Sequence, residues 1–382
     1  MSVAVELGGA MALALAVSAA ACTVAVRARV LDAPGGLIRK GDRPPIPTSG
    51  GVGIGFGVFA AMGLLAALPQ WGLDLSPAAP RWIAAALFVA ACALMIGLLD
   101  DIVAFGPKLK GAVFVALALA APAMIGPVEA LPLAFGMTLP LGYVVGLFGS
   151  ALWMFTIMNT VNFIDGANGL AMGSSAIGLT MLAVASFLAG APAAGSLALC
   201  AAAALIGFLV WNFPAGRLFA GDTGALFVGA LVGAIGLMAV EEGSLSPFVP
   251  PIVFFPMLGD VLLTLAWRVR HRTKVLEGHR DHFYQIGLRA GMPPWKVTLV
   301  YWALMAKCGV IGIAVTLAPQ TSPLDAAMAV ADAPPWTQAA VIAAAALAST
   351  TTLASFGVLA AVWLKASAKI RAYAKAQGHD TE

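Results

Sequence analysis

The sequence predicts an all-α integral membrane protein that crosses the bilayer about eleven times. Of its 382 residues, 61% are hydrophobic and only 10% are charged, whereas soluble domains carry about 25% charged residues. Mean hydropathy is +0.94. Apolar runs of about 20 residues, the length that crosses a bilayer, follow one another along most of the chain. These observations exclude a soluble multi-domain protein and predict a single membrane domain over residues 1–382.

The apolar runs define the expected helices, and many are rich in Ala and Gly, which lets neighbouring helices approach closely in a bilayer. The expected spans are 5–26, 51–69, 82–99, 111–127, 142–161, 170–189, 194–211, 224–240, 249–267, 297–317 and 338–364. The first run lacks a basic segment before it and follows Glu6, so we expect a retained span and not a cleaved signal peptide. The last run is longer than one span needs, which predicts tilt or an exposed end.

Basic residues gather on one side of this topology. The loops after every odd-numbered span up to the ninth, together with the C-terminal tail, hold 19 of the 21 Lys and Arg residues. The two others are Arg81, on the opposite side, and Lys307, within a span. The positive-inside rule makes the basic side cytoplasmic, with the N-terminus outside and the C-terminus in the cytoplasm. The net charge of +3 is too small to indicate a nucleic-acid partner.

Five polar segments interrupt the apolar pattern, and all of them fall on the predicted cytoplasmic side. They are IPTSGG (46–51), GLLDD (97–101), NTVNFIDGAN (159–168), FAGDTG (219–224) and GHRDHFYQ (278–285). A polar path through the bilayer would need polar residues at several depths. Polar segments confined to one face therefore predict a site at the membrane surface.

Asp100 and Asp101 end a helix, where two negative charges add to the negative end of the helix dipole. A counter-charge is therefore expected, either from Lys108 and Lys110 or from a divalent metal. Mg²⁺ typically binds one or two carboxylates together with substrate phosphates. A solvated start of a loop is the simpler alternative for this pair.

Asp222 lies in the FAGDTG segment, at the start of the helix expected over 224–240. An N-cap is the commoner use of Asp at that place, and a metal ligand is the alternative. The glycines on either side, Gly221 and Gly224, allow a phosphate to approach the backbone closely.

Asn159, Asn162 and Asp165 are three residues apart and share one helix face. Their amide and carboxylate groups suit hydrogen bonding to a ribose, a base or a metal-bound phosphate. Interhelical hydrogen bonding is the alternative interpretation.

His279, Arg280 and His282 are suited to donate hydrogen bonds to a phosphate. A zinc site is disfavoured, because no Cys or third His lies near them in the sequence. Asp260 is an acid within a span. It is either functional or paired with Lys307 or a loop arginine as part of the structure.

Taken in order, these segments resemble the polyprenyl-phosphate N-acetylhexosamine-1-phosphate transferase family, of the glycosyltransferase family 4 type. That family includes the phospho-N-acetylmuramoyl-pentapeptide transferases and the enzymes that initiate O-antigen synthesis. The resemblance covers about residues 30–290 and leaves 297–382 as C-terminal helices and a basic tail. Asn168, where the muramoyl branch has Asp, and HRDHFYQ, where it has three His, are similar to the O-antigen branch. Asp42, where His is usual, departs from the family pattern.

The resemblance implies an enzyme that transfers a sugar 1-phosphate from a UDP-N-acetylhexosamine to undecaprenyl phosphate and releases UMP. It implies Mg²⁺ as cofactor, with Mn²⁺ as an alternative, and initiation of a cell-surface glycan at the cytoplasmic face of the bacterial inner membrane. Membrane lipid surrounds such a protein, and a homodimer is compatible with the resemblance. Both a direct attack and a covalent intermediate stay open, as does the identity of the sugar.

The resemblance also implies roles for single residues. The implied catalytic residues are Asp100, Asp101 and Asp222, of which Asp222 and Asp101 would bind the metal. The implied nucleotide-sugar ligands are Asn162, Asp165, Asn168, Phe219, Lys108 and Lys110, and the implied sugar or diphosphate ligands are His279, Arg280 and His282. Two alternatives remain: the muramoyl-pentapeptide enzyme itself, or a cation-coupled transporter that uses Asp260 and Lys307.

Overall fold

The computed structural model describes residues 3–28, 47–67, 77–103, 105–133, 137–272 and 280–317, together with Lys365, Ala368 and Ala372. Within these ranges, nine helices are long and apolar enough to cross a membrane. They are α1 (Val3–Ala28), α2 (Gly50–Ala67), α3 (Ala79–Val103), α4 (Pro107–Ile125), α5 (Gly142–Ile164), α6 (Leu170–Leu188), α7 (Pro192–Asn212), α8 (Gly221–Glu242) and α12 (Pro294–Leu317). The all-α polytopic fold is therefore confirmed. The expected span at 338–364 lies outside the described residues, as do Asp42 and His279.

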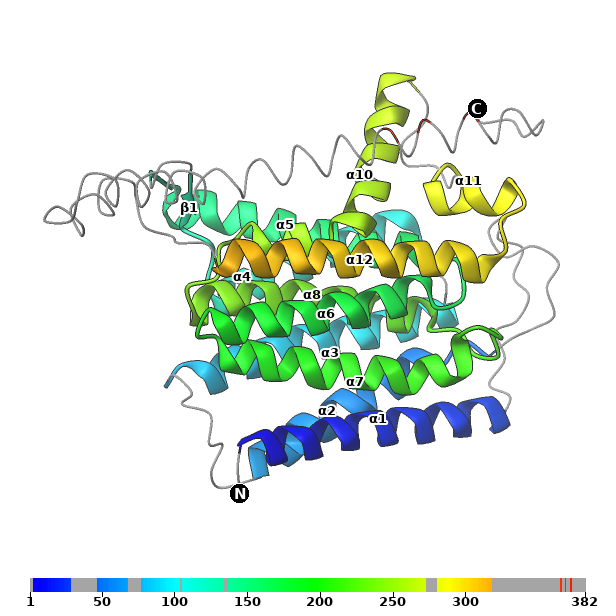
Figure 1. Cartoon of the computed structure of the whole chain (residues 1–382), viewed down its shortest axis with the longest axis horizontal. Helices are drawn as coiled ribbons and strands as arrows, with labels where there is room; N and C mark the ends of the chain where they lie inside the picture. The colour runs from blue at the N-terminus through cyan, green and yellow to red at the C-terminus, as the bar shows by residue number, and fades with distance from the viewer. Residues whose placement is uncertain are drawn as a thin grey trace, which may run out of the picture.

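The structure differs from the expectation of one continuous span over 249–267. Two helices lie there, α9 (Val249–Val253) and α10 (Phe255–Arg270), and Phe254 separates them. Prolines occupy the first turn of each helix, where the missing N–H of proline is tolerated. Because Pro256 cannot continue the hydrogen-bond ladder of α9, the chain turns at this point. Figure 1 shows α10 rising steeply from helices that otherwise run side by side.

The connection between α4 and α5 contains a short hairpin that the sequence did not predict. Strands β1 (Ala130–Pro132) and β2 (Thr138–Pro140) pair antiparallel, with Leu131 opposite Leu139. The hairpin lies at the end of the bundle opposite α11 (Phe283–Arg289), as Figure 1 shows.

Helix α8 forms the centre of the bundle. Every residue of α8 from Thr223 to Ala239 is buried, and α8 packs against α2, α3 and α5. Glycines allow the closest approaches. A Cβ on Gly51 of α2 would lie 2.2 Å from the Gly224 nitrogen, and one on Gly97 of α3 would lie 2.6 Å from the Asp222 carbonyl oxygen. The start of α8 is thereby held against the end of α3.

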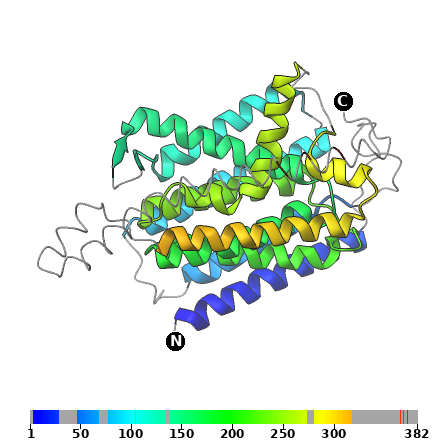
Figure 2. The ribbon, with the colours of Figure 1, turned by 45° about the horizontal axis from the view of Figure 1, so that its top comes forward.

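One end of the bundle collects the described residues of the polar motifs. Successive spanning helices alternate in direction, so α3, α5 and α7 end where α4, α6, α8 and α12 begin, close to α11 (Figures 1 and 2). We call this the site end. In the described part of the chain it also carries the basic side chains Arg27, Arg217, Arg289 and Lys296, whereas Glu129, Glu241 and Glu242 lie at the opposite end together with Arg81. The assignment of the site end to the cytoplasm stays a prediction.

Candidate active site

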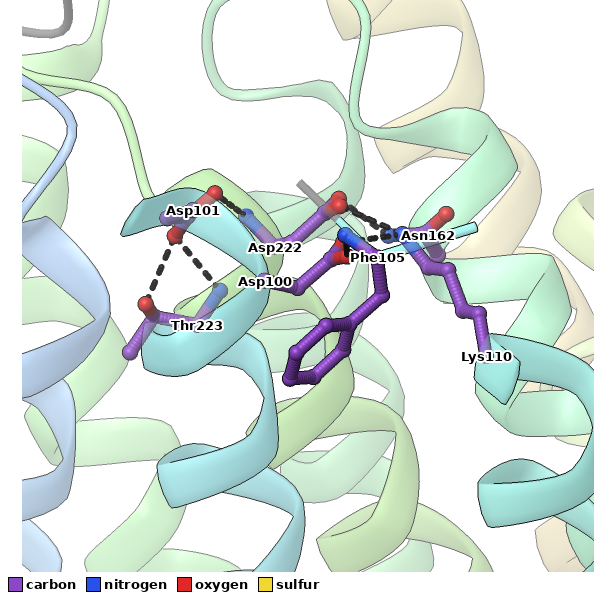
Figure 3. A network of polar contacts seen from close by, with 7 residues as sticks. All are labelled: Asp100, Asp101, Phe105, Lys110, Asn162, Asp222 and Thr223. Atoms are coloured by element: carbon purple, nitrogen blue, oxygen red, sulfur yellow. Dashed lines mark hydrogen bonds and ion pairs between the residues drawn. The ribbon is translucent and has the colours of Figure 1, made fainter. Parts of the chain in front are cut away.

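The carboxylates of Asp100 and Asp222 share one ammonium group. The Nζ atom of Lys110 lies 2.6 Å from Asp100 Oδ2 and 2.5 Å from Asp222 Oδ2. Asn162 donates a hydrogen bond of 2.7 Å from Nδ2 to the other oxygen of Asp222. The four side chains come from α3, α4, α5 and α8, and Figure 3 shows them converging at one point. We call these four residues the carboxylate cluster.

Asp100 is the most deeply placed acid of the carboxylate cluster, with only 8% of its surface exposed. Its Oδ1 accepts a hydrogen bond of 2.8 Å from the Phe105 N–H, in the turn between α3 and α4. Both oxygens of Asp100 therefore have a donor, and the turn that follows fixes the orientation of its carboxylate.

Asp101 has a different environment, because its carboxylate faces the first turn of α8. Its Oδ1 accepts the Asp222 N–H at 3.0 Å, and its Oδ2 accepts the Thr223 N–H at 3.0 Å and the Thr223 hydroxyl at 2.7 Å. The first N–H groups of a helix have no partner within the helix, and Asp101 supplies one from a neighbouring helix (Figure 3). Asp101, an expected metal ligand, thus has both oxygens engaged by the helix that carries Asp222.

Backbone hydrogen bonds join the PTSGG segment (47–51) to the residues just before α8. Phe219 donates its N–H to the Pro47 carbonyl at 2.8 Å, and the N–H groups of Gly50 and Gly51 bond the carbonyls of Phe219 and Ala220 at 3.0 and 3.1 Å. Gly221 has a φ angle of +70°, a conformation that side chains disfavour. The two motifs together determine where α8 begins, and therefore where Asp222 lies. Phe219 itself is half-buried in this junction.

Asp165 follows the last residue of α5 and is partly buried. Burial, together with the negative charges of Asp222 and Asp101, raises the pKa of its carboxyl to about 7. These charge interactions place Asp165 close to the carboxylate cluster.

Asn168 is engaged with a neighbouring loop. Its Nδ2 donates to the Pro214 carbonyl at 3.1 Å, and its own carbonyl accepts the Thr298 hydroxyl at 2.8 Å. Asn212, a residue that the sequence analysis missed, bonds the Gly169 N–H at 2.6 Å and the Leu218 carbonyl at 2.8 Å. The signal that could have found it is a lone Asn at the end of an apolar run. Asn168 and Asn212 thus join the turn after α5 to the loop before α8.

The remaining basic candidates are distributed around the site end. Lys108 is exposed and has no hydrogen bond or ion pair with any described residue. Arg280 is exposed, and its backbone carbonyl accepts a hydrogen bond of 2.8 Å from Arg289. His279 lies outside the described residues. Four basic ligands were expected in these two segments: Lys108, Lys110, His279 and Arg280. Among the described residues, only Lys110 lies at the carboxylates.

His282, an expected sugar or diphosphate ligand, is only 3% exposed. Its ring stacks on those of Phe163 and Tyr284, with centroids 5.8 and 6.1 Å away. Its Nδ1 lies 3.3 Å from Asp260 Oδ1. The structure therefore places His282 in the packing beneath α11, facing Asp260.

Magnesium fits the carboxylate cluster when a phosphate completes its coordination. Among the described residues, no group of three or more His, Cys, Asp or Glu side chains is arranged to hold a metal ion. Mg²⁺ usually takes one or two carboxylates and completes its shell with water and phosphate. Asp100 and Asp222 already face a common position where a positive charge lies, and the Asn162 amide Nδ2 holds the other oxygen of Asp222. The donor set is all oxygen, as a hard cation requires.

Comparison with known proteins agrees with this geometry. Residues 83–240 match the family model described as "Glycosyl transferase family 4", a range that contains the whole carboxylate cluster. The chain is 32% identical to the phospho-N-acetylmuramoyl-pentapeptide-transferase of Staphylococcus haemolyticus over 178 residues, which is 46% of this chain and 54% of that protein. It is also 32% identical to the Staphylococcus aureus protein of the same name over 177 residues, with the same coverage.

The chain thus matches about half the length of these curated relatives. The residues that match the family model include α4 to α7, most of α3 and α8, and every residue of the carboxylate cluster. Over residues 83–240, this chain is similar to glycosyl transferase family 4, and over 46% of its length it is similar to the phospho-N-acetylmuramoyl-pentapeptide-transferases.

Proposed function

We propose that this protein transfers a sugar 1-phosphate from a UDP-N-acetylhexosamine to undecaprenyl phosphate. The observation that carries the proposal is the pair of carboxylates, Asp100 and Asp222, that share a cation position at one end of an apolar bundle. This pair lies within the residues that match the family model. One substrate is soluble and the other is a lipid whose phosphate lies at the membrane surface. A polar site at the end of membrane-spanning helices is accessible to both.

The reaction exchanges one phosphoanhydride bond for another. A phosphate oxygen of undecaprenyl phosphate attacks the β-phosphorus of the donor. The bond between that phosphorus and the oxygen that bridges to the α-phosphorus breaks, and the electron pair leaves with UMP. The products are undecaprenyl-diphosphate-sugar and UMP, so that atoms and charge balance without an oxidant or a further reactant. Phosphoryl transfer of this kind depends mainly on positioning and on neutralisation of charge.

The side chains of the carboxylate cluster have distinct parts in this proposal. Asp222 would hold the metal at the position that it shares with Asp100, Asp100 would also orient the lipid phosphate, and the Lys110 ammonium would offset the charge of the incoming diphosphate. When bound, Mg²⁺ supplies further neutralisation of charge on the leaving UMP. Asp101 holds the start of α8 in place.

Donor recognition is assigned to the residues around the carboxylate cluster. Phe219 would stack on the uracil, Asp165 would contribute to the nucleotide side, and Arg280 would approach the sugar or diphosphate. Asn168 would act through the turn that it holds. The proposed location is the bacterial inner membrane, with the site end in the cytoplasm, as the basic residues of this end favour.

A second candidate is the phospho-N-acetylmuramoyl-pentapeptide transferase reaction, which the names of the curated relatives favour. It uses the same acceptor and the same phosphoryl chemistry, and differs in the donor. Asn168 and the sequence HRDHFYQ favour the smaller hexosamine donor, because they depart from the muramoyl pattern at two positions. The two candidates are separated by the donor that the protein accepts.

The test is release of UMP by the purified full-length protein with undecaprenyl phosphate, Mg²⁺ and a panel of UDP-sugars that includes UDP-N-acetylmuramoyl-pentapeptide. Release that requires both lipid and metal, and that disappears in Asp222→Asn, would support a transferase and identify its donor. Glu242→Gln is the matched control, because Glu242 caps α7 at the opposite end of the bundle. Absence of release with every donor, in protein that remains folded, would refute the proposal.

A further inference from the structure

A polar stripe on α10 lies outside the carboxylate cluster. Asp260, Thr264 and Arg268 follow one another at intervals of four residues and therefore share one face of the helix. Their exposed fractions are 0%, 0% and 8%. Buried polar side chains are unfavourable unless they are well paired, so the contacts of this polar stripe indicate what it is for.

Asp260 binds the first turn of α11. Its Oδ1 accepts the Phe283 N–H at 2.8 Å, and its Oδ2 accepts the Tyr301 hydroxyl of α12 at 2.5 Å. A longer contact of 3.4 Å joins Oδ2 to the Tyr284 N–H. Asp260 therefore accepts the first N–H groups of α11, beside the capping box that His282 and Gln285 form there, and ties three helices together. Among the described residues it forms no hydrogen bond or ion pair with Lys307, the partner that a transporter mechanism would require.

Arg268 extends the attachment by two helical turns. Its Nη1 forms an ion pair with Asp281, and both side chains are nearly buried. The polar stripe thus binds the chain on both sides of His282, through Asp281 and through Phe283.

Segment 280–284 also contacts the end of α5. The Tyr284 hydroxyl donates to the Phe163 carbonyl at 3.1 Å. A Cβ on Gly166 would lie 2.2 Å from that hydroxyl oxygen, so only glycine allows the contact. Phe163 and Gly166 flank Asp165 and follow Asn162. The segment 280–284 is therefore held between the polar stripe of α10 and the turn that carries proposed donor ligands.

We infer that Asp260 is a positioning residue that holds segment 280–284 over the donor side of the site. The inference rests on the proposed function, because the effect that we expect is on recognition of the sugar portion of a UDP-sugar. An amide at position 260 would present an N–H₂ group to one of the N–H or O–H donors that the carboxylate now accepts. The start of α11 would then lose its attachment to α10 and separate from α5, while the carboxylate cluster of α3, α4, α5 and α8 would stay as it is.

The test compares the binding of two ligands to Asp260→Asn in the full-length protein in detergent. Titration with UDP-N-acetylglucosamine measures recognition of nucleotide and sugar together, and titration with UDP measures the nucleotide part alone. We expect the dissociation constant for UDP-N-acetylglucosamine to rise about tenfold, equivalent to loss of one hydrogen bond to a charged group, and that for UDP to stay within about twofold. Glu242→Gln, which loses a helix cap at the opposite end, should change neither constant.

Hydrogen exchange of residues 280–289 gives the second measurement. Faster exchange there in Asp260→Asn, with unchanged exchange in α3 and α8, is the expected result. Tyr301→Phe removes only one donor and should give a smaller change of the same kind, which keeps the test valid if Asp260→Asn does not fold. Equal weakening of UDP and UDP-N-acetylglucosamine, or unchanged exchange in 280–289, would overturn the inference. If wild-type protein binds no UDP-sugar, the proposed function fails, and the exchange measurement alone decides the role of Asp260.

Discussion

The Lys110 ammonium lies 2.5 Å from a carboxylate oxygen of Asp222, although 112 positions separate the two residues in the chain. The same ammonium lies 2.6 Å from Asp100. It therefore occupies the position that a metal ion bound by these two carboxylates would need. A metal that binds Asp222 at this oxygen has to replace the ammonium.

Removal of this ammonium should strengthen metal binding in the absence of substrate. In Lys110→Met, Mn²⁺ no longer competes with a charged hydrogen bond, which is typically worth about 1.5–3 kcal/mol. We expect Mn²⁺, followed by electron paramagnetic resonance, to bind about tenfold or more tightly. Lys108→Met is the control, since Lys108 is exposed, and it should leave the Mn²⁺ affinity unchanged. Weaker Mn²⁺ binding in Lys110→Met would mean that Lys110 supports the metal site and does not compete with it.

Asp101 should affect stability more than metal affinity. Asp101→Asn replaces an oxygen that accepts from the first turn of α8 by a nitrogen that cannot. Loss of a helix cap destabilises a protein by about 1 kcal/mol, so thermal unfolding in detergent should shift downward. The Mn²⁺ affinity of Asp101→Asn should stay within about threefold of wild type, whereas Asp222→Asn should abolish binding. If Asp101→Asn also abolished binding in folded protein, Asp101 would be a metal ligand, as the family resemblance implies.

The sequence predicted the helices well, because each long apolar run had to become a helix in a bilayer. It could not predict the break at Phe254, since hydropathy is high on both sides and only the prolines at 250, 251 and 256 indicated a turn. The hairpin at 130–140 was missed for a similar reason, because short strands produce little periodicity.

For the candidate site, too, the sequence predicted one part and not the other. The motifs identified the segments that carry Asp100, Asn162 and Asp222, but not their partners. That Asp101 faces α8 depends on a contact between residues 121 positions apart. That His282 is buried depends on Asp260 and Phe163, which lie on two other helices. Such contacts follow from the packing of helices, which a single sequence does not specify.

Asp165 should make metal binding depend on pH near neutrality. Its pKa is raised to about 7 by burial and by the charges of Asp222 and Asp101. As pH rises through 7 the carboxyl becomes negative, and a third charge close to the carboxylate cluster favours a divalent cation. We expect Mn²⁺ affinity to increase between pH 6 and 8 in wild type. Asp165→Asn should have weaker dependence over the same range, and an identical profile for the two proteins would contradict the assignment.

The raised pKa of Asp165 also affects the stability of the fold. Metal affinity should increase with pH, whereas this contribution to stability should decrease. Between the ordinary pKa of 3.8 and about 7, the folded protein holds a proton on Asp165 that the unfolded chain has lost. Stability therefore falls as pH rises across this window. In Asp165→Asn this contribution is absent, so the unfolding temperature should decline less between pH 4 and 7, measured in the same detergent without metal.

Gly51 and Gly63, both in α2, offer a matched test of the contact between α2 and α8. A Cβ on Gly51 would lie 2.2 Å from the Gly224 nitrogen and 2.4 Å from its Cα, whereas a Cβ on Gly63 would meet nothing within 4 Å. Backbone atoms cannot move aside as a flexible side chain can, so Gly51→Ala should separate the two helices. Overpacking of this kind typically destabilises a protein by about 1–3 kcal/mol.

Because α8 carries Asp222 in its first turn, Gly51→Ala should also displace that carboxylate from Asn162 and Lys110. We therefore expect a lower unfolding temperature together with weaker Mn²⁺ binding. Gly63→Ala, on the same helix, should leave Mn²⁺ binding unchanged and unfold at or slightly above the wild-type temperature, since Ala favours the helix over Gly. If Gly51→Ala lowered stability without changing Mn²⁺ affinity, the position of Asp222 would depend on Asp101 and α3 alone, and the PTSGG segment would have no part in forming the metal site.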